Sequence, residues 1–179
     1  SFLSWTGGGI TLKRNDRFFK AFARFAQERD DVYVVTIQAG PDAAFAPTLV
    51  RDLGIESRVR FVPSMDKASL LEHYRWSDVI VDQFGMPKLG INALEGMSCA
   101  RPVMVSLDAL TVDHCYGDAP PVYACTTEEE ILSELRSVGT KEAARQRGQR
   151  CRDWILKHHH WDTVTTHLMK VYDEVYRQR

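Results

Sequence analysis

The fold is decided by residues 77–105, which read SDVIVDQFGMPKLGINALEGMSCARPVMV. A short β-branched run at residues 79–81 leads into a loop that Gly85, Pro87 and Gly90 punctuate, and residues 92–99 then have the composition of an apolar helix. A second short apolar run follows at residues 103–105. Parallel neighbouring strands need a crossover connection, which is usually a helix, so this order predicts a strand–helix–strand unit of a parallel sheet.

The same alternation continues on both sides of this stretch. Residues 32–37 are a nearly continuous apolar run, which is typical of a strand buried on both faces of a parallel sheet. Further strands are predicted at residues 3–6, 59–62 and 122–124, and helices at residues 18–26, 43–53, 67–76 and 127–138. After Gly139 the pattern is helical only. The sequence therefore predicts an α/β fold, a doubly wound parallel sheet with C-terminal helices, in a single domain over residues 1–179.

The composition limits the class of partner. The 179 residues are 44% hydrophobic, which is ample for a core, and the formal net charge of -1 lacks the basic excess of a nucleic-acid or anionic-membrane binder. The four cysteines form no Cys-x-x-Cys pair, which favours a reduced, cytoplasmic protein over a disulfide framework. The first dozen residues lack the order of a signal peptide, and no apolar run of about 18 residues is present. The tryptophans are expected in core or helix-packing positions, at Trp5, Trp76, Trp154 and Trp161.

Ligands of an open α/β sheet bind beyond the carboxyl ends of its strands, where loops lead into helix N-termini. The first such loop holds Gly7, Gly8 and Gly9, followed by Lys13 and Arg14 at the start of a helix. Glycines let the backbone approach a ligand closely, and the two cations would attract phosphate. This loop is either a phosphate site or a flexible turn with a solvated basic pair.

The loop at residues 82–90 is a second candidate. Asp82 and Gln83 end a buried strand, Gly90 precedes a helix, and Glu95 lies inside that otherwise apolar helix. A carboxylate there can accept two hydroxyl hydrogen bonds, as a ribose diol offers, or it can simply complement the helix dipole. The three histidines at residues 158–160 are not expected to bind metal, because consecutive helical residues point in different directions.

Three segments resemble a known family. Residues 58–62 (RVRFV), 70–81 (LLEHYRWSDVIV) and 93–103 (ALEGMSCARPV) look like the C-terminal half of a GT-B glycosyltransferase. The nearest group is family GT4, whose members are retaining enzymes that use nucleotide-sugar donors. Lys13 and Asp16 fall where that family has its Lys-Gly-x-Asp helix start, and residues 160–172 are similar to its closing helix. The resemblance covers nearly the whole chain and implies one Rossmann-like half of a GT-B fold.

The resemblance implies a role for each matching position. Glu95 matches the second glutamate of the family's Glu-x7-Glu motif, which holds the donor ribose, and Lys13, with Arg14 close by, matches the lysine that neutralises the diphosphate. The backbone amides of Gly90 and Ile91 match the loop that meets the phosphates. The loop that packs on the nucleobase is matched by Val62, Pro63 and Ser64.

The chain also departs from the family pattern. The first glutamate of the motif is replaced by Pro87, so the usual contact to the donor sugar is absent, and Asp82 or Gln83 are candidates to replace it. Arg14 stands where the family has glycine.

The resemblance implies a transferase. We expect the donor-binding domain of a retaining glycosyltransferase, which moves a hexose from a nucleoside diphosphate sugar to an acceptor that the sequence does not identify. Lys13, Arg14 and the helix N-terminus would meet the phosphate charge, so neither a cofactor nor a metal is expected. The partner is an N-terminal acceptor domain of the same protein that these 179 residues do not contain. The alternative, suggested by Pro87, is a non-catalytic relative that binds nucleotides or partner domains.

Overall fold

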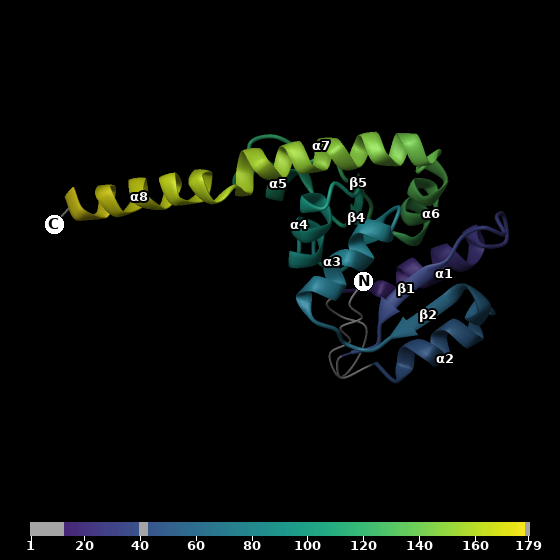
Figure 1. The fold of residues 1–179 in the computed structure, drawn as a ribbon. Helices are drawn as coiled ribbons and strands as arrows, with labels where there is room; N and C mark the ends of the chain where they lie inside the picture. The colour runs from purple at the N-terminus through teal and green to yellow at the C-terminus, as the bar shows by residue number, and fades with distance from the viewer. Residues whose placement is uncertain (1–12, 40–42, 178–179) are drawn as a thin grey trace.

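The computed structural model describes residues 13–39 and 43–177 (Figure 1). Within these ranges the chain alternates between helices and strands up to residue 137 and is helical afterwards. The helices are α1 (Asn15–Phe25), α2 (Phe45–Asp52), α3 (Lys67–Trp76), α4 (Ile91–Ser98), α5 (Ala109–Cys115), α6 (Glu128–Ser137), α7 (Lys141–His159) and α8 (Trp161–Arg177), with a 3-10 turn, η1 (Glu56–Arg58). The strands are β1 (Val34–Ile37), β2 (Val59–Val62), β3 (Ile80–Val81), β4 (Val103–Val105) and β5 (Tyr123–Ala124).

The described strands form two parallel sheets. Strands β1 and β2 pair in the register Val34 to Val59, and β3, β4 and β5 pair in that order, with Ile80 opposite Val103. Each pair of parallel neighbours is joined by a crossover that contains a helix, as parallel pairing requires. The predicted α/β fold with parallel strands and C-terminal helices is confirmed. The strand predicted at residues 3–6 lies outside the described residues.

Helix starts are fixed by side chains that accept hydrogen bonds from free backbone N–H groups. Asp66 caps α3 by accepting from the N–H of Ser69, and Asp108 caps α5 by accepting from that of Thr111. Thr127 and Glu130 form a capping box at the start of α6. The capping residues set the helix boundaries, so α3 begins immediately after Asp66 at the predicted residue.

Two apolar clusters hold the helices on the sheets. The first lies where α1 packs on α6, with Phe18, Phe19 and Phe22 buried beside Phe84. The second lies where α4 packs on α7, with Met97, Cys151 and Trp154 buried around the three-stranded sheet. Together they fix the carboxyl ends of β3 and β4 relative to α1 and α4.

Three burial expectations are wrong. Trp76 and Trp161 have exposed fractions of 85% and 69%, so among the described tryptophans only Trp154 belongs to the core. Val35 of β1 is 46% exposed, so the expected burial of this strand on both faces is wrong. A groove of about 860 Å³ lies between β1 and β3 and is lined by apolar side chains such as Ile37, Leu70 and Ile80.

The last helix, α8, extends away from the rest of the molecule (Figure 1). It contacts α7 at its start, and none of its described residues is buried. The helices within the described ranges are all too short or too polar to cross a lipid bilayer.

Candidate functional site

Asp82 follows the last residue of β3 and contacts the start of α4 through Gly90. Asp82 is 1% exposed, and its Oδ2 accepts a hydrogen bond from the Gly90 N–H at 2.9 Å, whereas its Oδ1 is buried with no hydrogen-bond partner among residues 13–39 and 43–177. A Cβ at position 90 would lie 2.4 Å from that Oδ2, so the close approach requires glycine. Burial raises the pKa of Asp82, while the charge of Lys13 and the N–H groups of Gly90 and Ala93 act in the opposite direction.

Glu95 lies one turn further along α4 and is 22% exposed at its side chain. Its Oε1 pairs with the Lys67 ammonium at 2.5 Å, and its Oε2 is buried with no hydrogen-bond partner in the part of the chain that the structure describes. Lys67 is the first residue of α3, so the ion pair ties the starts of α3 and α4 together. The remaining oxygen is an acceptor that a ligand hydroxyl can satisfy.

Tyr74 and Asn92 form a buried hydrogen bond between the same two helices. The Tyr74 hydroxyl donates to Asn92 Oδ1 at 3.2 Å. Burial raises the pKa of Tyr74, and the charges of Glu95 and Asp82 raise it further. Tyr74 therefore stays neutral. Its hydroxyl bonds to Asn92 and lies near enough to Glu95 and Asp82 for their charges to act on it.

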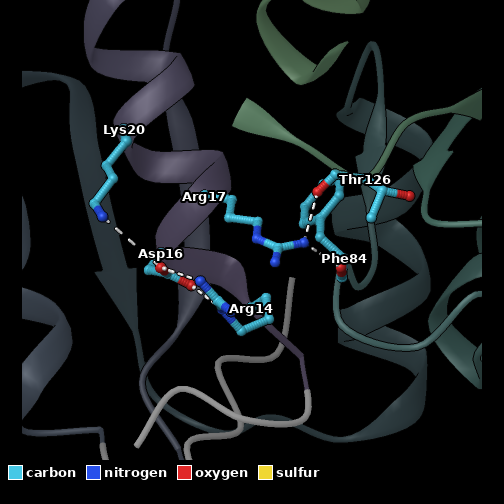
Figure 2. Close-up of polar contacts among 6 residues, drawn as sticks. All are labelled: Arg14, Asp16, Arg17, Lys20, Phe84 and Thr126. Carbon is cyan, nitrogen blue, oxygen red and sulfur yellow. Dashed lines mark hydrogen bonds and ion pairs between the residues drawn. The ribbon is translucent and has the colours of Figure 1, made fainter. Parts of the chain in front are cut away.

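The segment before α1 lies against the loop that follows β3. The Lys13 carbonyl accepts from the Phe84 N–H at 2.7 Å, and the ring of Phe84 stacks on that of Phe18. Arg14 has a φ of 49°, in the left-handed region that glycine tolerates at no cost. Its guanidinium pairs with the buried Asp16 at 3.2 Å, as Figure 2 shows.

Arg17 links the ends of two strands, a role that the sequence analysis missed. Its Nη1 donates to the carbonyl of Phe84 at 3.1 Å and to that of Thr126 at 2.9 Å (Figure 2). These carbonyls follow β3 and β5, so Arg17 holds α1 on the carboxyl edge of the three-stranded sheet. The two contacts of Arg17 join residues that are 67 and 109 positions apart in the chain. Such distant contacts leave no signal in a single sequence.

The other predicted site residues lie in loops at the same ends of the strands. Val62 ends β2, and its carbonyl accepts from the Gln38 N–H at 2.9 Å, which leaves Pro63 and Ser64 exposed. Gly90 caps α4 with no side-chain bond, and Ile91 is exposed. Pro87 is exposed in the preceding loop, which Gln83 braces by donating to the Lys88 carbonyl at 3.1 Å. Gly7, Gly8 and Gly9 lie outside the described residues.

This arrangement suits an anionic ligand with hydroxyl groups. The start of α4 presents backbone N–H groups and the positive end of its dipole, Lys13 adds a cation, and Glu95 offers an acceptor. Neither Asp82 nor Glu95 lines the apolar groove between β1 and β3, so we do not place the site in that groove. The described residues contain no group of three or more His, Cys, Asp or Glu side chains that could hold a metal ion.

Comparisons with known proteins show the family of the chain. The family model of glycosyl transferases group 1 matches residues 9–143. The chain belongs to this family. The match to glycosyl transferases group 1 includes α1 and α4 and every described site residue, and it confirms the resemblance to GT-B glycosyltransferases and to transferases as a class.

Individual relatives and structures lead to the same family. The chain is 32% identical over 104 residues to a D-inositol 3-phosphate glycosyltransferase of Kineococcus radiotolerans, a match that covers 53% of this chain and 24% of the relative. It is 22% identical over 177 residues to the uncharacterized glycosyltransferase YqgM of Bacillus subtilis, covering 98% of this chain and 49% of the relative. The structure of Anabaena HepE in complex with UDP-glucose matches with a TM-score of 0.74 and 12% identity, over 97% of this chain and 47% of that one.

This group 1 glycosyltransferase chain therefore spans no more than about half the length of these relatives. The family and the fold are established for the chain, whereas donor and acceptor are not given by the match.

Proposed function

We propose that this chain is the nucleotide-sugar-binding domain of a retaining, GT4-like glycosyltransferase that transfers a hexose from a nucleoside diphosphate sugar. The observation that carries the proposal is the half-satisfied Glu95 at the head of α4, with one oxygen paired to Lys67 and the other buried with no partner among the described residues. A buried carboxylate oxygen without a donor is unfavourable, and a ribose hydroxyl would satisfy it. HepE, which shares the fold, was crystallised with UDP-glucose.

In the proposed complex the donor lies across the carboxyl ends of the strands. Glu95 Oε2 accepts a ribose hydroxyl, and Val62, Pro63 and Ser64 lie against the nucleobase. The diphosphate meets the backbone N–H groups of α4 from Ile91 onward. This assignment is supported by the position of all these residues beyond β2 and β3.

Lys13 is the main cation of the proposed site. It lies close enough to Asp82 for its charge to lower the pKa of that carboxyl, and Asp82 contacts the head of α4. Arg14 is a weaker candidate, because Asp16 already pairs with its guanidinium. With the leaving diphosphate stabilised by Lys13 and the helix N–H groups, the reaction needs no metal and no cofactor.

The acceptor would bind a preceding domain of the same protein. One face of α8 carries exposed apolar residues that recur every three or four positions, at Trp161, Val164, Leu168, Val171 and Val175. This spacing is typical of a helix that packs along a partner element. The relatives contain about as many further residues as this chain supplies, which is room for such a domain.

The free cysteines of the described residues fit a reducing, cytoplasmic compartment.

A second candidate is a relative that binds the nucleotide without transfer. Pro87 favours it, because proline offers no side-chain contact to a sugar where the family has glutamate. Release of nucleoside diphosphate from a nucleotide sugar by the full-length protein would separate transfer from binding alone.

The proposal is tested by calorimetric titration of UDP, GDP and ADP into the wild-type chain and Glu95→Ala. The loss of a buried hydroxyl contact should weaken binding by about 1–3 kcal/mol. Glu72→Ala is the matched control, because Glu72 is an exposed glutamate of α3 whose partner is Arg75. An unchanged affinity of Glu95→Ala would remove Glu95 from the site, and the absence of binding by any of the three nucleotides would overturn the proposal.

A further inference from the structure

The start of α4 already holds an anion of the protein itself. Asp82 belongs to the end of β3, yet its Oδ2 takes the first free N–H of α4, that of Gly90, at 2.9 Å. The Ala93 N–H also favours the charged form of this carboxyl and acts against the rise of its pKa. Gly90 itself has no side chain to cap the helix, so Asp82 supplies the cap from a neighbouring strand.

The surroundings of Asp82 show that it is more than a cap. An ordinary capping carboxylate is exposed and hydrated, as Asp66 at α3 is. Asp82 is 1% exposed, and no described residue forms a hydrogen bond with its Oδ1, so its charge is poorly screened by water. A buried, half-satisfied carboxylate therefore acts strongly on any other charge brought to the head of α4.

Other charged and titratable groups face Asp82 from α1 and α3. Lys13, just before α1, contributes a positive charge, and Tyr74 of α3 contributes a neutral phenol. Glu95 acts on the same Tyr74, but its own charge is compensated by Lys67. Asp82 thus adds one negative charge, opposed by the positive charge of Lys13, at the place where the proposed function puts the diphosphate.

We propose that Asp82 makes this site discriminate against the nucleoside diphosphate product relative to the nucleotide-sugar donor. The inference rests on the proposed function, since it assumes that the diphosphate binds at α4. The terminal phosphate of a free diphosphate has its second pKa near 6 and carries roughly one more negative charge at pH 8 than the same phosphate esterified to a sugar. Asp82 repels that additional charge and so favours release of the product.

The expected size of the effect follows from Coulomb's law. A phosphate that accepts from the α4 amides next to Gly90 lies within about 8 Å of the Asp82 carboxylate. At that separation, and with an effective dielectric constant of about 20, one unit charge changes a binding constant by about thirtyfold. Removal of the Asp82 charge should therefore tighten binding of the diphosphate about thirtyfold more than that of the sugar ester, which lacks the additional charge.

The test compares Asp82→Asn with the wild-type chain in calorimetric titrations at pH 8. The ligands are UDP, GDP and ADP, each paired with its glucose ester. Asparagine keeps an oxygen that can accept from the Gly90 N–H, so the variant removes charge at nearly constant shape. Asp78→Asn is the matched control, because Asp78 is exposed and precedes the amino end of β3. Thermal unfolding shows that each variant is folded, and Asp82→Ser replaces Asp82→Asn if the amide prevents folding.

We expect Asp82→Asn to bind the diphosphate about thirtyfold more tightly relative to its glucose ester than the wild type does, and Asp78→Asn to leave the ratio unchanged. Equal tightening of both ligands, an unchanged ratio, or weaker binding of the diphosphate would each overturn it, although nucleotide binding by the wild type would still support the proposed function. If the wild-type chain binds none of the six ligands, the proposed function and this inference both fail.

Discussion

Gly148 of α7 lies against the backbone at the end of α4, the helix that carries the candidate site. A Cβ on Gly148 would lie 2.1 Å from the carbonyl oxygen of Ala100 and 2.8 Å from its carbonyl carbon. Both are backbone atoms, so no change of rotamer relieves the overlap, and Ala100 already has a φ of 56°. We expect Gly148→Ala to force α7 away from α4 by about 1 Å, toward the 3.4 Å of an ordinary contact.

Two opposing effects set the size of the change. Alanine in place of glycine in a helix interior gains about 1 kcal/mol. Overpacking of a well-packed contact costs about 1–3 kcal/mol, and we expect the upper end because the obstacle is main chain and because Cys151 and Trp154 pack at the same interface. The net expectation is a loss of about 2 kcal/mol in the free energy of unfolding, or a decrease in Tm of about 4–8 °C for a domain of this size.

Urea unfolding, followed by circular dichroism and tryptophan fluorescence, measures this loss. Arg145→Ala is the control, because Arg145 is exposed on the same helix and should change stability by no more than about 0.5 kcal/mol. If Gly148→Ala is as stable as the wild type, the packing of α7 on α4 described here is wrong.

Two further predictions concern acid stability and cysteine reactivity. The N–H groups of Thr127 and Thr126 lower the pKa of Glu130 in the folded state, so the stability that this carboxylate contributes is present above the ordinary pKa of 4.5 and is lost as the pH falls through the lower folded pKa. Between about pH 5 and pH 3 the free energy of unfolding should therefore fall less steeply in Glu130→Gln than in the wild type. Identical slopes in urea titrations would contradict this. Burial raises the pKa of Cys125 to about 12 and that of Cys151 to about 11, whereas Cys115 is exposed, so iodoacetamide at pH 8 should label Cys115 first by mass spectrometry, and early labelling of Cys151 would contradict the packing of α7.

Local patterns were enough to predict much of the fold. The strands at residues 59–62 and 103–105 and the helix at residues 67–76 have the predicted bounds, because apolar runs, capping residues and turn residues are all close in sequence. The run at residues 32–37 forms a strand from Val34 onward, with Tyr33 exposed, because the pairing with β2 begins at Val34. Helix α5 was not predicted, since its seven residues are too few for a clear periodicity.

The sequence named the residues of the candidate site, which stay a prediction, but not how they pair. Glu95, Gly90 and Lys13 were named from the strand ends and from the family resemblance. The partner of Glu95, Lys67, lies 28 residues away, and no local pattern joins the two. The environment of Asp82 was equally inaccessible, because burial and an unpaired oxygen depend on how α4 and the segment before α1 close over the end of β3.

The central claim is that a nucleoside diphosphate binds at the head of α4. Chemical-shift mapping of the ¹⁵N-labelled chain during titration with UDP, GDP and ADP tests it most directly. We predict that at least one nucleotide shifts the amides of Gly90, Ile91 and Glu95 together with that of Ser64, and leaves those of α8 unchanged. Saturable shifts confined to other elements, or no shifts with any of the three, would contradict the claim.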